Sequence, residues 1–288
     1  MSAKNKARAQ MALSAAVFGT IPLFVRNLSL TSGEIALYRA LIASILIGVC
    51  LLLSRQKTPF SAIRRELPAL LLSGVAMGFN WILLFQAYRY TTVSVATLSY
   101  YFAPVLVTIA CPILFHEKMT KRQILCFVMS TIGVVLIVAA GESSGAENHF
   151  VGIALGLGAA VLYASVVLTN KFIRNVSGIQ RTFFQFAAAA VVLIPYVACT
   201  DGFHLGELTV AGWANLMILG LFHTGVTYFL YFISLRELPG QEAAILSYID
   251  PLVAIVLSVA VLQEEISDLQ ILGGAMVLGF ALWNECEK

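Results

Sequence analysis

Apolar runs long enough to cross a lipid bilayer constrain this chain more than any other feature of its sequence. A membrane-spanning helix needs about 20 mostly apolar residues. The predicted spans are residues 10–26, 35–54, 67–87, 93–115, 123–140, 151–171, 182–199, 211–234, 241–262 and 268–284. Because 59% of the residues are hydrophobic and only 11% are charged, the chain has more apolar surface than a soluble domain can bury. We therefore predict an all-α membrane protein of ten transmembrane helices.

The basic residues predict the orientation of these spans, because Lys and Arg in short loops favour the cytoplasmic side. With the N-terminus inside, fifteen of the eighteen Lys and Arg residues lie on the inner side. Arg26 and Arg89 lie outside, and Arg39 lies within the second span. We expect a multi-pass protein of the plasma (inner) membrane with both termini in the cytoplasm.

The second half of the chain repeats the first at an offset of 147 residues. The coinciding residues are of types that apolar composition does not explain: Tyr101 with Tyr248, Pro104 with Pro251, and Glu117-Lys-Met-Thr120 with Glu264-Glu-Ile-Ser267. Each half, 1–145 and 146–288, contains five predicted spans, so the second copy must enter the membrane from the opposite side. Such an inverted repeat is typical of transporters that work by alternating access.

One pattern occurs twice in this ten-span chain: an aromatic residue, a proline within the span, and then Glu-x-[apolar]-[Ser/Thr]-x-x-Gln. It ends at Gln123 in the first half and at Gln270 in the second. The doubled pattern resembles the EamA branch of the drug/metabolite transporter superfamily. The resemblance implies a helix bundle with a central cavity bounded by spans 1–4 and 6–9, and with spans 5 and 10 at the periphery. It also implies carriage of amino acids or related metabolites, often as export.

Asp250 is the candidate for coupling or for substrate binding. It lies near the middle of the ninth span, directly before Pro251, and an ionisable group at that depth costs about 2.5–3.5 kcal/mol on insertion scales. Its counterpart in the first half is Ala103, so the carboxylate is not part of the repeated scaffold. Accepting a proton and binding an amino group both fit this position. A structural carboxylate bonded to helix ends is the alternative.

Three further polar residues lie within spans. His223 fits either a proton relay or a bridge between two helices. Asn80 fits either a bond between helices or a contact with substrate. Arg39 fits binding of a substrate carboxylate, and snorkelling or pairing across helices are its alternatives.

Aromatic residues within the spans are candidates for the wall of a cavity that holds an apolar or aromatic group. They are Trp81, Tyr100, Tyr101, Tyr163, Tyr228 and Tyr248, with Trp81, Tyr101, Tyr163 and Tyr248 as the site candidates. Packing or lipid-facing roles are the alternative for each. Pro104 and Pro251 each remove a backbone donor, and we expect them to kink their spans at matching places and to act as hinges. Simple bending for packing is the alternative.

Several function classes are not expected. The chain has no H-E-x-x-H, G-x-S-x-G or phosphate-binding P-loop, and its five cysteines show no C-x-x-C, so we predict no enzyme, cofactor or metal. A net charge of +3, with basic residues between the apolar runs, does not favour nucleic-acid binding.

We therefore predict a secondary transporter, and an exporter, of small metabolites such as amino acids or related amines. Its expected partners are the substrate, the lipid bilayer and protons, and its expected state is a monomer or a weak homodimer. Proton coupling through Asp250 and uniport along the substrate gradient both fit. An intramembrane enzyme and a passive channel or receptor are the alternatives.

Overall fold

The computed structural model describes residues 3–54, 60–115, 120–141, 148–200, 202–238 and 240–285. Within these ranges the chain is all-helical and has no strand. This agrees with the sequence, because in lipid a helix satisfies its backbone donors and acceptors within one segment. Glu117 of the repeated pattern lies outside the described residues.

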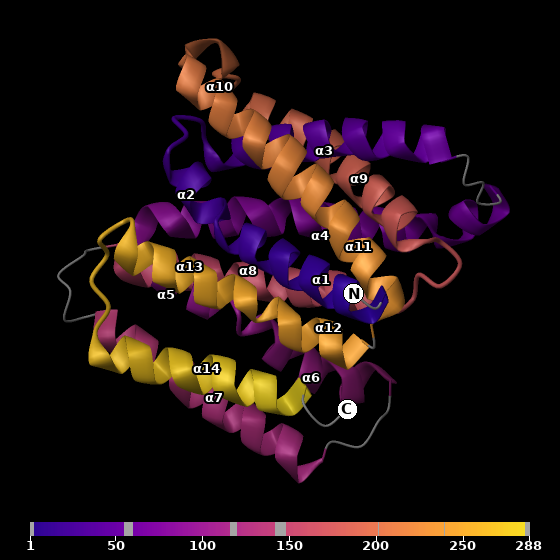
Figure 1. The fold of residues 1–288 in the computed structure, drawn as a ribbon. Coiled ribbons are helices and arrows are strands. Elements are labelled where there is room, and N and C mark those ends of the chain that lie inside the picture. Colours follow the sequence, from indigo (N-terminus) through magenta and orange to yellow (C-terminus); the bar gives the residue numbers. More distant parts are fainter. Residues whose placement is uncertain are drawn as a thin grey trace.

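The elements, in chain order, are α1 (Ala3–Gly19), α2 (Ile21–Arg26), α3 (Ser32–Ser54), α4 (Phe60–Tyr90), α5 (Val93–Tyr100), α6 (Ala103–Phe115), α7 (Lys121–Gly141), α8 (His149–Asn170), α9 (Gly178–Cys199), the 3₁₀-helix η2 (Leu205–Glu207), α10 (Val210–Met217), the π-helix η3 (Ile218–Val226), α11 (Thr227–Glu237), α12 (Gly240–Ser247), α13 (Ile249–Ala260) and α14 (Asp268–Glu285). They form one bundle, in which α1 begins and α14 ends at the same end, on the right in Figure 1.

Eight helices in the described ranges are long and apolar enough to cross a membrane. They are Lys4–Arg26, Ser32–Leu53, Ile63–Tyr90, Val93–Ala110, Lys121–Ala140, His149–Asn170, Gly178–Cys199 and Val210–Tyr231. These eight coincide with the first eight predicted spans. The ninth predicted span corresponds to a shorter apolar helix, Ile245–Ala260. The tenth corresponds to α14, which carries Asp268 at its start and Glu285 at its end and is not among the eight.

Three of the predicted spans are broken rather than continuous. The breaks fall between α1 and α2, between α5 and α6, and between α12 and α13. Pro22, Pro104 and Pro251 lie in the first turns of α2, α6 and α13, where a proline removes no helical hydrogen bond. The backbone is therefore interrupted just before each proline, so these spans consist of two helices each and are not simply bent.

Glycines allow two helices, α7 and α14, to approach each other closely. At Gly133 in α7, an added Cβ would lie 2.6 Å from the carbonyl oxygen of Gly273 in α14, and at Gly273 it would lie 2.5 Å from that of Gly133. The two helices therefore cross in direct backbone contact and form a pair at one edge of the bundle (Figure 1). Neither helix of this pair contributes to the wall of the cavity described next.

Candidate functional site

A cavity of about 380 Å³ lies among α1–α6, α8 and α11–α13. Within the described ranges, none of its lining residues comes from α7, α9 or α14. Its aromatic lining residues are Phe18, Trp81, Phe85, Tyr88, Tyr100, Tyr101, Tyr163, Tyr228, Tyr231 and Tyr248. Arg39 and Asp250 are the only charged residues on the described wall. A volume of this size suits a small molecule that has both charged and apolar parts.

Asp250 lies where two broken spans meet. It belongs to the first turn of α13, where the free backbone N–H groups of the helix favour a negative charge. Its Oδ2 accepts a hydrogen bond from the hydroxyl of Tyr101, which lies in the break between α5 and α6, at 2.7 Å. The last residue of α1, Gly19, packs against the same place, since an added Cβ would lie 2.5 Å from the carbonyl oxygen of Asp250. All three broken spans therefore meet at Asp250.

Arg39 of α3 is the cation of the cavity, and only 3% of the residue is exposed. Its Nε donates to the Oγ1 of Thr224 at 2.6 Å. Its guanidinium carbon lies 4.5 Å from the ring centre of Trp81 and 5.7 Å from that of Phe85, which stabilises the charge through the ring faces. In the described part of the chain no carboxylate is within ion-pair distance of it. A buried cation with only a hydroxyl and aromatic faces as partners is suited to bind an anionic group.

The π-helix η3 explains why Thr224 reaches Arg39. The hydroxyls of Thr224 in this helix and of Thr227, the first residue of α11, donate to the carbonyl oxygens five residues earlier, those of Leu219 and Phe222, both at 2.8 Å. The wider turn directs two consecutive side chains inward. His223 points to the break between α1 and α2, where its Nε2 lies 2.7 Å from the Oγ1 of Thr20, and Thr224 points to Arg39. Stretches of π-helix are frequent at functional sites.

Most of the residues singled out from the sequence line the cavity, and three do not. Those on its wall are Arg39, Trp81, Tyr101, Pro104, Tyr163, Tyr248 and Asp250. Asn80 instead donates to the carbonyl oxygen of Ala159 at 2.6 Å and so joins α4 to α8. His223 joins η3 to Thr20, and Pro251 is buried in α13 and is not among the lining residues. Asn80 and His223 thus make hydrogen-bonding contacts between helices, which the sequence analysis gave as the alternative to a role in substrate binding or proton relay.

Sequence reasoning missed other residues of the wall. Tyr88 lies at the end of a predicted span and Tyr231 near the end of another, where a tyrosine normally marks the membrane interface, so their positions gave no signal. Phe18 and Phe85 are apolar residues in apolar runs, so nothing in the sequence distinguishes them from residues that face lipid or pack in the core. Thr224, which does not line the cavity but accepts from Arg39, has no charge to mark it. Tyr100 and Tyr228 do meet the criterion of an aromatic within a span.

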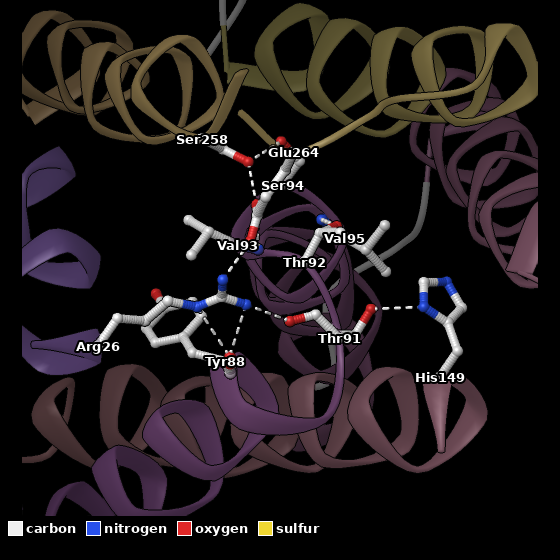
Figure 2. A network of polar contacts seen from close by, with 10 residues as sticks. All are labelled: Arg26, Tyr88, Thr91, Thr92, Val93, Ser94, Val95, His149, Ser258 and Glu264. Carbon is white, nitrogen blue, oxygen red and sulfur yellow. Dashed lines mark hydrogen bonds and ion pairs between the residues drawn. The ribbon is translucent and has the colours of Figure 1, made fainter. Parts of the chain in front are cut away.

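A second polar cluster closes one end of the bundle (Figure 2). Arg26, the last residue of α2, forms an ion pair with Glu264 at 2.6 Å between Nη1 and Oε1. Its Nε and Nη2 donate to the carbonyl oxygen of Tyr88 at 3.0 and 2.8 Å, and its Nη2 also donates to that of Thr91 at 2.9 Å. The Oε2 of Glu264 accepts the backbone N–H of Val93 at 2.8 Å. We call this cluster, with Ser94 and Ser258, the end network.

The serines extend the end network into the helices. The hydroxyl of Ser258 in α13 donates to Glu264, and that of Ser94 in α5 donates to Ser258 at 2.9 Å. Ser94 and Ser258 are both buried. Beside them, the Oγ1 of Thr91 lies 2.7 Å from the Nδ1 of His149, the first residue of α8 (Figure 2). Four separate segments are therefore held together at this end.

Ion pairs at the opposite end of the first span are more exposed. Lys4 and Arg8 of α1 both pair with Glu242 of α12, the former at 3.4 Å between Nζ and Oε2. The side chains of Lys4 and Arg8 are 50% and 48% exposed, compared with 31% for Arg26, and that of Glu242 is 24% exposed, compared with 8% for Glu264. Because exposed pairs contribute little to stability, we expect these two ion pairs to be weaker than that of Arg26 with Glu264.

Comparison with known proteins places these features in a family. The EamA-like transporter family matches the chain twice, over residues 7–139 and 150–284. An uncharacterized transporter of Bacillus subtilis (strain 168), YxxF, is 32% identical over 263 residues, which cover 89% of this chain and 83% of that protein. Protein PecM of Dickeya dadantii (strain 3937) is 26% identical over 240 residues, covering 82% and 78%. A solved crystal structure of a protein shares the fold with a TM-score of 0.66 at 16% identity, covering 96% of this chain and 95% of that one.

Proposed function

Because this chain belongs to the EamA-like transporter family, we propose that it is a secondary transporter that exports small metabolites, such as amino acids or related amines, across the plasma membrane by alternating access. The observation that carries the proposal is the presence of one buried cation, Arg39, and one half-buried carboxylate, Asp250, on the wall of a cavity otherwise rich in aromatic rings. Such a site has a partner for each part of an amino acid.

Binding follows from the chemistry of the wall. A substrate carboxylate completes the coordination of the Arg39 guanidinium, whose plane is already fixed by Thr224 and Trp81. A substrate ammonium group binds Asp250, whose second oxygen is not used by Tyr101. The aromatic rings bury the apolar part of the substrate. With about 380 Å³ of space, the cavity admits a single small molecule.

Alternating access requires two halves that move about this cavity, and we infer that 1–145 and 146–288 are these halves, each with five spans and of opposite orientation. Two observations support this. The family matches once in each half. The packing also repeats, because α1 packs on α11 and α13, while α8, its counterpart, packs on α4 and α6. Contacts exchanged in this way are expected of an inverted repeat.

Asp250 is also the group we propose for proton coupling. A half-buried carboxylate on the cavity wall that alternates between a proton and a substrate ammonium group makes the two compete, so an inward proton flux would drive outward substrate flux. Pro104 and Pro251 are the proposed hinges, since each follows a break in its span. The proposal includes no cofactor and no catalytic step, and the functional unit is a monomer or a weak homodimer with both termini in the cytoplasm.

The proposal is tested with purified protein in proteoliposomes. Uptake of radiolabelled amino acids and of the amines that lack their carboxylate is measured with and without a pH gradient. We expect saturable uptake of at least one compound, and a response to the gradient. Protein-free liposomes and the variant Arg39→Gln are the controls. Uptake that is not saturable for any compound of the panel would contradict the proposal.

A further inference from the structure

The end network joins the two halves of the chain about one helical turn beyond residues of the cavity wall. Arg26 lies four residues, about one helical turn, beyond Pro22 of the cavity wall in α2. Ser258 lies the same distance beyond Ala254 of the wall in α13. Tyr88 takes part in both, since its ring lines the cavity and its carbonyl oxygen accepts from Arg26. The network is therefore a layer one turn thick between the cavity and this end of the bundle.

The network connects the two halves of the chain through a small number of polar contacts. Arg26, Tyr88, Thr91 and Val93 belong to the first half, and Glu264 belongs to the second. The two halves are linked here by the Arg26–Glu264 ion pair, by the backbone N–H of Val93 donating to Glu264 and by the hydroxyl pair Ser94–Ser258, and beside them by the contact of Thr91 with His149. All are polar contacts, and none is a large interlocking apolar surface. Polar contacts of this kind can be exchanged for water without leaving a void.

The exposure of the two charges allows the pair to open. The side chain of Arg26 is 31% exposed and that of Glu264 is 8% exposed, so the ion pair lies at the boundary with water. Breaking a buried ion pair is unfavourable when it leaves one charge buried without a partner. If the halves separate here, both charges become hydrated, so neither is left in that position. The pair therefore stabilises the closed form without preventing the open one.

We propose that the end network is a gate, in which the Arg26–Glu264 ion pair closes one access route to the cavity and its separation opens that route. The gate deepens the proposed function, because it rests on alternating access. In the orientation proposed above it is the outer gate. The more exposed pairs of Glu242 with Lys4 and Arg8 lie at the other end and hold α1 to α12 less firmly. The state described here is thus one in which the outer route is shut.

The test measures access to the cavity and needs no known substrate. In a cysteine-free background, Ala254→Cys serves as the reporter, because Ala254 lines the cavity next to the gate and is only 2% exposed. A membrane-impermeant maleimide is added to right-side-out and to inside-out vesicles, and the rate of labelling is measured from each side. Labelling after denaturation gives the total amount of reporter.

The variants Arg26→Gln and Glu264→Gln are expected to speed labelling from the gate side by about tenfold or more, and not from the other side. The double variant is expected to label no faster than either single variant, because one interaction is lost in all three. Arg89→Gln is the matched control, since Arg89 lies at the same end but donates to the carbonyl oxygen of Leu30 within the first half. Unchanged rates, an equal effect of Arg89→Gln, or multiplying effects in the double variant would overturn the gate.

A second measurement keeps Arg26 and Glu264 in place and so does not depend on how their variants fold. Spin labels are attached at exposed positions beside the pair, Ser29 and Val261, and their separation is measured in proteoliposomes. The gate predicts two populations, one that fits this structure and one longer. A single population that fits this structure would overturn the gate. Substrate uptake in the same preparation tests the proposed function separately, so the two failures are distinguishable.

Discussion

Each of the two charges in the cavity is held by a neutral partner. Asp250 accepts from the hydroxyl of Tyr101, and Arg39 donates to the hydroxyl of Thr224 and lies against Trp81. Neutral partners fix the position of a charge without cancelling it, so both groups can still bind ions of the opposite sign. At this scale the sequence was informative for Asp250 and Arg39, because a charge within an apolar run is conspicuous. Thr224 became visible only when the fold brought it to Arg39.

The first prediction concerns Asp250. Replacing it with asparagine removes the group proposed to carry the proton and to bind the substrate ammonium group. Uptake by Asp250→Asn should therefore no longer respond to a pH gradient, while exchange of substrate across the membrane continues with a raised KM. Uptake and exchange are compared in proteoliposomes. Asp268→Asn, at the exposed start of α14, should keep the response of the unaltered protein. A pH response that survives in Asp250→Asn would remove its coupling role.

The second prediction concerns Thr224. Valine has the same shape but cannot accept from Arg39, so Thr224→Val leaves the guanidinium misplaced. A charged hydrogen bond is worth about 1.5–3 kcal/mol, and we expect the KM for substrates that carry a carboxylate to rise about tenfold or more. The KM for the matching amines should change little. Thr224→Ser keeps the hydroxyl and should restore the carboxylate preference. If valine raised both KM values equally, Thr224 would have a structural role only.

At the scale of elements, the positions of the helices follow from hydropathy but their interruptions do not. Pro104 and Pro251 mark two of the breaks, because proline is favoured in the first turn of a new helix. The π-helix Ile218–Val226 could not be predicted, since its sequence is as apolar as that of an α-helix and only the packing of its neighbours selects the wider turn. The last two predicted spans are also shorter or less apolar than the others, as polar residues lie at their ends.

The third prediction tests the glycine contact between α7 and α14. An added methyl group at Gly273 meets the backbone of Gly133, so Gly273→Ala should destabilise the protein by about 1–3 kcal/mol. Gly279→Ala in the same helix is the control, because nothing lies within 4 Å of the added group. Thermal unfolding in detergent measures the difference. Equal melting temperatures for the two variants would show that this backbone contact does not hold α14 in place.

At the scale of the whole molecule, the cavity arises from spans that are far apart in sequence. Trp81, Tyr163 and Asp250 come from three different spans, and no periodicity within one span tells which face turns toward another. The sequence also does not show that Asn80 and His223, which are polar residues within spans like Arg39 and Asp250, join helices to each other and do not line the cavity. The repeated pattern did mark Glu264, but not its pairing with Arg26, because that contact exists only once the halves are assembled.

The central claim is that one cavity, bounded by both halves, is opened alternately to the two sides of the membrane. Exchange tests it most directly. Proteoliposomes are loaded with an unlabelled compound that the protein takes up, and entry of the same compound in labelled form is compared with entry into empty vesicles. A carrier predicts severalfold faster entry into the loaded vesicles, because the occupied cavity returns faster than the empty one. Equal entry into loaded and empty vesicles, rising in proportion to concentration, would indicate a passive pore and contradict this account.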